Sequence, residues 1–133
     1  MREIKFRAWV KGNIPNGQQY SGMYPVVSIL QTSVLVERAS AFAECCFEFK
    51  DVELMQYIGL KDKNGKEIYE GDIVKIGNDI CLIGWNAHFA SFCLMKNGWL
   101  HDHFFYEAVN PEDCEIIGNT YKKPDLIGKG ATI

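Results

Sequence analysis

Apolar and polar residues alternate over several short stretches in the first third of the chain, which is the pattern of half-buried β-strands. Residues 4–8 alternate Ile, Phe and Ala with Lys and Arg. Residues 26–36 are rich in β-branched side chains and predict one or two further strands. Residues 39–46 remain ambiguous, because Ser40 could cap a short helix, whereas the apolar residues of 45–49 alternate as in a strand.

From residue 52 onward, short apolar stretches alternate with tight turns. Asn64-Gly65, Gly71 and Asn97-Gly98 supply residues that tolerate the positive φ of a chain reversal. Asn110-Pro111 predicts the cap and first position of one helical turn, and residues 124–127 predict another. The predicted strands are 52–60, 66–69, 73–76, 80–85, 89–95, 99–105 and 116–117.

The fold class that follows is mainly β. A meander of short strands buries one face by curling, so residues 53–120 predict an SH3-like, partly open barrel. Residues 1–52 predict an N-terminal β-rich layer packed on it, and one or two short helical turns complete the fold. We therefore expect segments 1–52 and 53–133 to form one compact unit, since no linker separates them.

Composition narrows the class of protein. The 133 residues are 47% hydrophobic and 23% charged, as in a globular domain, and the net charge of −3 gives no global attraction for nucleic acid or an anionic membrane. The five cysteines are odd in number and lack a CxxC spacing, which predicts free thiols. We expect a cytoplasmic protein with no secretory signal, no membrane span and no cofactor.

His101-Asp102-His103 is the sequence's metal-like cluster, with His88 as a third ligand that a zinc site would need. In a regular strand, His101 and His103 would share one face. A solvated strand face is the favoured interpretation, so the expectation is no metal site, with His101 and His103 as weak candidates.

Acidic residues gather around the central turns at Glu67, Glu70 and Asp72. Paired carboxyl groups can perform acid–base chemistry when their pKa values are pushed apart. We favour a structural role, in which Asp72 bonds the amides of its own turn and Gly65, Gly71 and Asp72 form an architectural motif.

Three lysines, Lys61, Lys63 and Lys66, form a basic hairpin tip, which could contact nucleic acid if aromatic side chains nearby supplied a stacking platform. Asp62 and Glu67 interrupt the basic charge, so a solvated tip and a filled core are preferred. The aromatic residues in question are Trp85, Phe89, Phe92 and Trp99.

Three blocks of the chain together resemble the YopX family, whose members are encoded mostly by phages and prophages. The blocks are Arg2–Trp9, the run Met55–Val74, and Glu115–Tyr121 followed by Pro124 and Leu126, and Trp85 also fits. Two positions depart from the family pattern: Ile58 stands where Thr is usual, and Val10 where Asp often follows the Trp.

The resemblance implies a phage or prophage accessory protein in the cytoplasm of a bacterial host. It does not imply any particular enzymatic reaction. We expect a non-enzymatic protein that binds an unknown protein partner and forms a homo-oligomer, since exposed strand edges are commonly covered by a second copy. A small-barrel nucleic-acid-binding module using Lys61–Lys66 is the alternative, and a metal-dependent enzyme using His101 and His103 is the third hypothesis.

Overall fold

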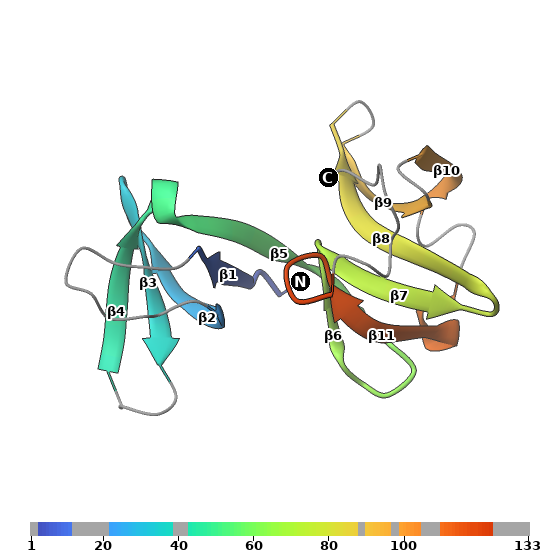
Figure 1. Ribbon diagram of the computed structural model, residues 1–133, viewed down its shortest axis with the longest axis horizontal. Coiled ribbons are helices and arrows are strands. Elements are labelled where there is room, and N and C mark those ends of the chain that lie inside the picture. Colours follow the sequence, from blue (N-terminus) through green and yellow to red (C-terminus); the bar gives the residue numbers. More distant parts are fainter. Residues whose placement is uncertain are drawn as a thin grey trace. The chain divides into compact units, whose positions relative to one another are not determined.

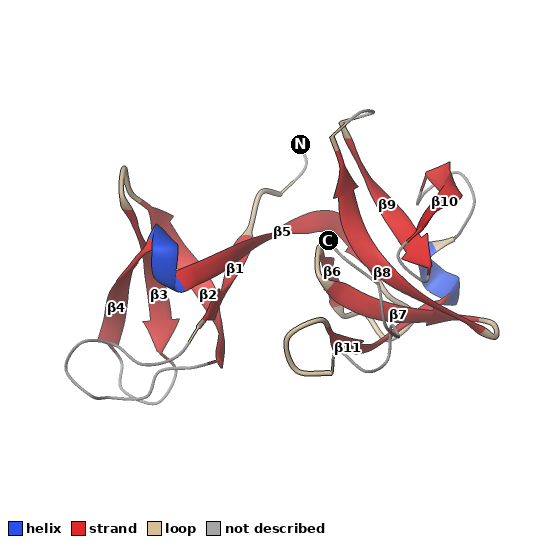
Figure 2. Ribbon diagram, turned by 45° about the horizontal axis from the view of Figure 1, so that its top comes forward, coloured by secondary structure: helices blue, strands red, loops and turns tan. Residues whose placement is uncertain are grey.

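The computed structural model describes residues 3–11, 22–38, 43–87, 90–96, 99–104 and 110–123, and nearly all of them are strands joined by turns (Figures 1 and 2). The mainly β prediction is confirmed. The chain divides into two compact units: an N-terminal unit, Ile4–Gln56, and a C-terminal unit, Tyr57–Ile133 with Met1–Glu3.

The N-terminal unit is an antiparallel sheet in the order β4-β3-β2-β1-β5. Residues 26–36, predicted to form one or two strands, contribute to two, and the part of the ambiguous segment that the structure describes is a strand from residue 43. The bounds are β1 Phe6–Val10, β2 Gly22–Ile29, β3 Ser33–Arg38, β4 Ala43–Glu48 and the first half of β5 Val52–Lys61, with the 3-10 turn η1 Phe49–Asp51 before β5.

One face of this sheet carries the core of the N-terminal unit. Val34 and Val36 alternate along β3 and are fully buried, and Val34 lies opposite Phe47 of β4. Ala8 and Val10 alternate in the same way along β1. Burying an aliphatic or aromatic side chain stabilises a fold by roughly 1.5–3 kcal/mol, so this alternation holds the strands in register.

The C-terminal unit contains the second half of β5 paired with β6 Glu67–Tyr69, and a five-stranded antiparallel sheet. The sheet order is β10-β9-β8-β7-β11. The bounds are β7 Asp72–Ile76, β8 Asp79–Asn86, β9 Ser91–Lys96, β10 Trp99–Phe104 and β11 Cys114–Asn119, with the 3-10 turn η2 Pro111–Asp113 before β11.

The five-stranded sheet does not close into a barrel, because β10 and β11 lie at its two ends and do not pair with each other. β11 returns to pair with β7 instead, from Cys114 opposite Ile76 to Asn119 opposite Asp72. Both faces of the central strands are buried: Ile73 and Val74 are consecutive in β7, point to opposite sides and have no exposed surface.

The predicted helical turn at Asn110 is present as η2. The Asn110 side-chain Oδ1 accepts a hydrogen bond from the backbone N–H of Glu112 at 3.1 Å, which is the cap that the residue type predicts. The second predicted turn, 124–127, lies outside the described residues.

The boundary between the two units falls after Gln56, inside β5, whereas the sequence placed it between residues 52 and 53. β5 is one continuous ten-residue strand whose first half pairs with β1 and whose second half pairs with β6. A change of pairing partner within a strand leaves no turn residue behind, so the sequence pattern did not locate it.

Candidate functional site

Asp62 is the buried centre of the hairpin between β5 and β6, with only 5% of its surface exposed. Its Oδ1 accepts hydrogen bonds from the backbone N–H groups of Asn64 and Lys66, each at 2.9 Å. Its Oδ2 accepts a third from the backbone N–H of Ile116 at 3.0 Å. One carboxylate therefore shapes its own turn and ties it to β11.

Backbone and side-chain contacts strengthen this connection between the hairpin and β11. The N–H of Lys63 donates to the carbonyl of Cys114 at 2.9 Å, and the Lys63 ammonium pairs with Glu115 at 3.3 Å. The edge of β11 that faces away from β7 thus has N–H and C=O groups satisfied by the hairpin. A satisfied edge is closed to pairing with another strand.

The charge state of Asp62 follows from these contacts. Burial by itself raises the pKa of the Asp62 carboxyl, but the hydrogen bonds from Ile116, Lys66 and Asn64, together with the Lys66 charge, outweigh burial and leave the pKa below its ordinary value. The group is an ionised acceptor at neutral pH. It has no proton to donate, which suits a structural carboxylate and not a general acid.

Gly71 and Asp72 form the second structural centre. Gly71 has φ of +87°, donates its N–H to the carbonyl of Ile83 at 2.7 Å, and accepts from the N–H of Thr120 at 2.9 Å. Asp72, 2% exposed, accepts a hydrogen bond from the N–H of Tyr69 at 2.8 Å. Gly65, in the hairpin turn, has φ of +78°, so both motif glycines adopt the left-handed conformation expected of them.

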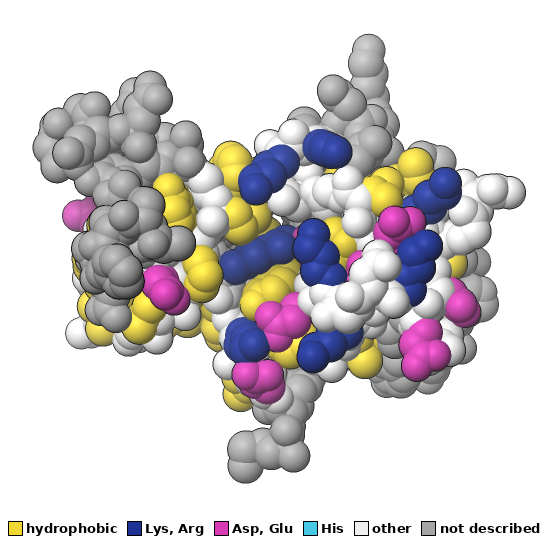
Figure 3. All heavy atoms as spheres, turned by 90° about the horizontal axis from the view of Figure 1, so that it is seen from below, with side chains coloured by type: hydrophobic (Ala, Val, Ile, Leu, Met, Phe, Trp, Pro, Cys, Tyr) yellow, Lys and Arg dark blue, Asp and Glu magenta, His cyan; other side chains and the backbone are white. Residues whose placement is uncertain are grey.

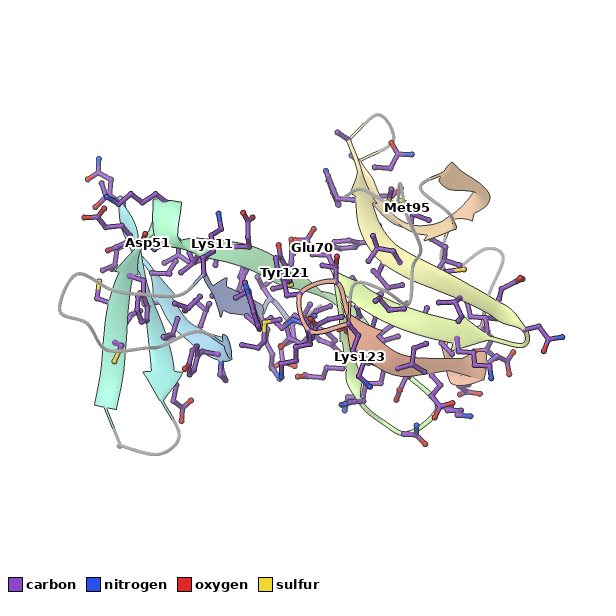
Figure 4. All side chains as sticks on the ribbon, viewed as in Figure 1. Lys11, Asp51, Glu70, Met95, Tyr121 and Lys123 are labelled. Carbon is purple, nitrogen blue, oxygen red and sulfur yellow. The ribbon has the colours of Figure 1, made fainter. Side chains whose placement is uncertain are left out.

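Asn119, at the end of β11, completes this centre opposite Asp72. Its Oδ1 accepts from the N–H groups of Tyr121 at 3.0 Å and Lys122 at 2.9 Å, and its carbonyl accepts from the N–H of Lys123 at 2.9 Å. Figure 4 labels Tyr121 and Lys123 in the turn that follows. The two family blocks that lie far apart in the sequence therefore meet in the fold.

The three acidic candidates lie at or beside the turn between β6 and β7. Asp72 bonds the backbone of its own turn, as the structural interpretation expected. The Tyr69 hydroxyl lies 3.5 Å from Glu67 Oε1, and its ring packs against Tyr57 with centroids 5.6 Å apart. Glu70 is partly exposed.

The three lysines of the tip are all exposed, but their surroundings are mixed in charge. Lys63 pairs with Glu115, and Lys61 lies opposite Glu67 across the hairpin. Lys66 acts electrostatically on Asp62. On the face that Figure 3 draws, acidic side chains lie among the basic ones.

Two of the four candidate aromatic residues form a pair on the sheet. Trp85 of β8 lies opposite Phe92 of β9, with ring centroids 5.0 Å apart in an edge-to-face arrangement. Trp85 is 49% exposed, so it does not lie in the core, where most of the four aromatic residues were expected. Phe89 lies outside the described residues, and Trp99 begins β10.

His101 and His103 both lie in β10, as predicted. The pairing of β10 with β9 shifts between Leu100 and Phe104, however, so strict alternation of faces does not apply to that stretch. His88 lies outside the described residues, and the described part of the chain contains no group of three residues arranged to hold a metal ion.

The five cysteines are free thiols, and Cys81, Cys93 and Cys114 are buried. Burial raises the pKa of the Cys93 thiol. Burial also raises the pKa of Cys114 to about 11, with the nearby Asp113, Cys81 and Asp62 adding to the effect. A thiol with such a pKa is protonated at neutral pH and is a poor nucleophile.

Sequence reasoning treated Asp62 only as a turn residue and a break in the basic charge. An Asp placed two residues before Asn-Gly, as in Asp62-Lys63-Asn64-Gly65, is typical of a side chain that bonds its own turn, so this local role was predictable. The bond from Asp62 to Ile116 spans 54 residues, and no local pattern contains it.

Comparison with known proteins finds a family model and a solved structure that each match most of the chain. The family model described as YopX protein matches residues 5–128. The crystal structure of protein EF1440 from Enterococcus faecalis is similar with a TM-score of 0.60 and 21% sequence identity, and the match covers 96% of this chain and 99% of that one. At this identity the likeness shows the fold alone. No curated protein matches the chain.

A search of the described residues for a helix long and apolar enough to cross a membrane finds none.

Proposed function

The chain belongs to the YopX family, and we propose that it is a phage or prophage accessory protein that acts by binding and self-assembly, and not by catalysis. The family resemblance supports the phage or prophage origin. The remainder of the proposal rests on how the chain uses its polar groups and its strand edges.

The observation that supports the proposal most directly is that Asp62 accepts hydrogen bonds from backbone N–H groups. This carboxylate lies inside the family run, and three backbone N–H groups from two distant segments share its two oxygens. Asp72 and Asn119 also accept bonds from backbone N–H groups. These bonds support a scaffold role for the family motif, because its most buried polar groups hold neighbouring turns and strands together.

Self-assembly is supported by the N-terminal unit. In the described part of that unit, β4 pairs with β3 and with no other strand, which leaves an edge of its sheet. Residues 4–56 contain five basic and five acidic residues, so the unit has no net charge. A surface without net charge does not repel a second copy, and proteins near neutrality associate more readily.

The alternative of nucleic-acid binding has weaker support. Trp85 offers an exposed ring, but Lys63 is paired with Glu115 and Lys61 lies opposite Glu67, so the tip presents alternating charge to a phosphate backbone. The third hypothesis, a metal-dependent enzyme, would need His101 and His103 to converge from an irregular part of β10.

Light scattering of the purified full-length chain tests self-assembly. We expect a mass at least twice the 15.1 kDa of one chain at about 50 μM, since a specific interface of standard size persists at such concentrations. A stable monomer under these conditions would overturn the proposal of self-assembly. Affinity capture from phage-infected cells then identifies a protein partner.

A further inference from the structure

The tip of the hairpin between β5 and β6 places an asparagine directly before a glycine, at Asn64-Gly65, and both residues are exposed. Asparagine is among the chemically labile residues, and here the backbone nitrogen of Gly65 can attack the amide carbon of the Asn64 side chain. Glycine has no Cβ to obstruct that attack, and a Cβ built at Gly65 would meet no atom within 4 Å. The residue pair and its open surroundings therefore favour reaction.

The hydrogen bonds of the tip oppose this reaction. The Gly65 N–H donates to the backbone carbonyl of Asp62 at 3.0 Å. The Asp62 carboxylate holds the residues on either side of Gly65, since its Oδ1 accepts from the N–H groups of Asn64 and Lys66, each at 2.9 Å. Attack requires the Gly65 N–H to give up its proton, and so to lose its bond to the Asp62 carbonyl.

The charge of Asp62 opposes the reaction as well. The attacking species is the deprotonated amide of Gly65, which carries a negative charge. In the folded tip that charge would lie against the carbonyl oxygen of Asp62 and close to its ionised carboxylate. Repulsion between like charges at short range raises the free energy needed to remove the proton.

We propose that Asn64 is a latent deamidation site, which Asp62 keeps closed in the folded chain and which reacts when the hairpin tip opens. In the reaction the Gly65 nitrogen loses its proton and bonds to Asn64 Cγ, the bond from Cγ to Nδ2 breaks, and ammonia leaves with that proton. Water then opens the resulting succinimide ring at one of its two carbonyl groups, which yields aspartate or isoaspartate at position 64. This inference does not depend on the proposed self-assembly.

The product should weaken the attachment of the hairpin to β11. A carboxylate at position 64 adds a negative charge beside Asp62, which already bonds the N–H of that residue. Isoaspartate also inserts a methylene group into the backbone before Gly65, and so displaces the N–H that bonds the Asp62 carbonyl. Because Asp62 also accepts from the N–H of Ile116 at 3.0 Å, a displaced Asp62 releases the edge of β11.

The first test compares the native and the denatured full-length wild type. Both samples are incubated at physiological pH and temperature, one in buffer and one in guanidinium chloride, and peptide mapping by mass spectrometry follows the residue. Mapping distinguishes Asn64 from Asn97, which also precedes a glycine. Asn64 should react at least about tenfold faster in the denatured chain, because the reaction in the native chain requires local opening against several hydrogen bonds. Equal rates would overturn the proposal.

The second test opens the tip by substitution. Asp62→Ala should increase the rate at Asn64 at least about tenfold, because two of the bonds around Gly65 are lost. Lys61→Ala, at an exposed neighbouring position, is the matched control and should leave the rate unchanged. Adding Gly65→Ala to Asp62→Ala should remove the increase, since a Cβ obstructs attack by the backbone nitrogen.

Circular dichroism verifies that the variants are folded, and the comparison of native and denatured wild type decides the proposal even if Asp62→Ala does not fold. A folded Asp62→Ala that reacts no faster than Lys61→Ala overturns the role of Asp62. A rate that Gly65→Ala leaves unchanged overturns attack by the Gly65 nitrogen and indicates direct hydrolysis of the side chain.

The last measurement concerns the product. Ion-exchange chromatography separates the deamidated chain from the unmodified one, because the product has an additional negative charge. Hydrogen exchange followed by NMR should then be faster for the Ile116 amide in the deamidated chain than in the unmodified chain. Equal exchange at Ile116 would overturn the predicted release of β11.

Discussion

The carboxylate of Asp62 lies 3.0 Å from the backbone nitrogen of Ile116, across 54 residues of sequence. This bond joins the family's central run to its C-terminal block. It also occupies an N–H group on the edge of β11, which would otherwise be open to another strand. Asp62 and its neighbour Lys63 together therefore hold the hairpin against the returning strand.

Replacing Asp62 should destabilise the C-terminal unit. Asp62→Ala leaves the N–H groups of Asn64, Lys66 and Ile116 without their partly buried acceptor, and an unsatisfied buried group costs roughly 1–3 kcal/mol. We expect a loss of at least about 2 kcal/mol in the free energy of unfolding, measured by urea denaturation. Lys61→Ala, on the exposed neighbour, is the control and should change stability little; equal effects of the two substitutions would refute the role of Asp62.

The same carboxylate predicts how stability depends on pH. Its pKa in the folded protein is below the ordinary value of 3.8. The unfolded chain therefore binds the proton more readily, and stability from this group is fully present above pH 3.8 and is lost as the pH falls through the folded pKa.

Urea denaturation of wild type and Asp62→Asn between pH 2 and pH 6 measures this dependence, and the difference between the two proteins isolates the carboxylate. The wild type should lose more stability on acidification than Asp62→Asn does. Parallel curves for the two proteins would show that the Asp62 pKa is the same in the folded and unfolded chains.

The two motif glycines should differ in their sensitivity to substitution. A Cβ at Gly65 would meet no atom within 4 Å, so Gly65→Ala adds only the strain of its φ of +78°, roughly 1–2 kcal/mol. Gly71 is buried and is hydrogen-bonded to Ile83 and Thr120. Gly71→Val would therefore have two costs, the strain of the positive φ and the extra volume of a side chain in a buried position.

We expect Gly71→Val to lower the melting temperature more than Gly65→Val, and both more than any single Lys→Ala change at the tip. Differential scanning calorimetry decides the order. If Gly71→Val were tolerated as well as Lys66→Ala, the motif would serve surface recognition and not architecture.

Local patterns predicted most of the elements of the C-terminal unit, because several of the described turns there contain residues whose type favours a chain reversal or a helix cap. Asn64-Gly65 and Gly71 marked reversals, and Asn110 marked η2. Closure into a barrel was not determined by such patterns. Which strand β11 joins depends on partners far away in the sequence, and the structure pairs it with β7 and with the hairpin of Asp62.

The candidate site was harder to predict for the same reason. The sequence identified Asp72 as a turn carboxylate, and the bond to Tyr69 is local. Exposure is a property of the whole fold, however, so alternation could not show that Trp85 is half exposed.

Removing an imidazole at His101 should leave the metal content unchanged. The irregular pairing of β10 removes the simple reason for His101 and His103 to share a face. Elemental analysis of wild type and His101→Ala should give well below one zinc or manganese ion per chain for both. About one metal per chain in the wild type, lost in His101→Ala, would instead support the enzyme hypothesis, because an adventitious ion would not depend on one side chain.

Reversing the charge of the hairpin tip distinguishes assembly from nucleic-acid binding. Changing Lys61, Lys63 and Lys66 together to Glu should leave the oligomer intact, since the proposed self-assembly is argued from the N-terminal unit and the tip lies in the C-terminal unit. Stability should fall by no more than about 1 kcal/mol from loss of the half-exposed pair between Lys63 and Glu115.

Fluorescence anisotropy with a labelled single-stranded oligonucleotide at two salt concentrations provides the second measurement. Tight wild-type binding that weakens steeply with salt and disappears in the triple variant would favour the nucleic-acid alternative, because counterion release requires that dependence. We expect weak binding that the triple substitution does not change, as the alternating charges around the tip predict.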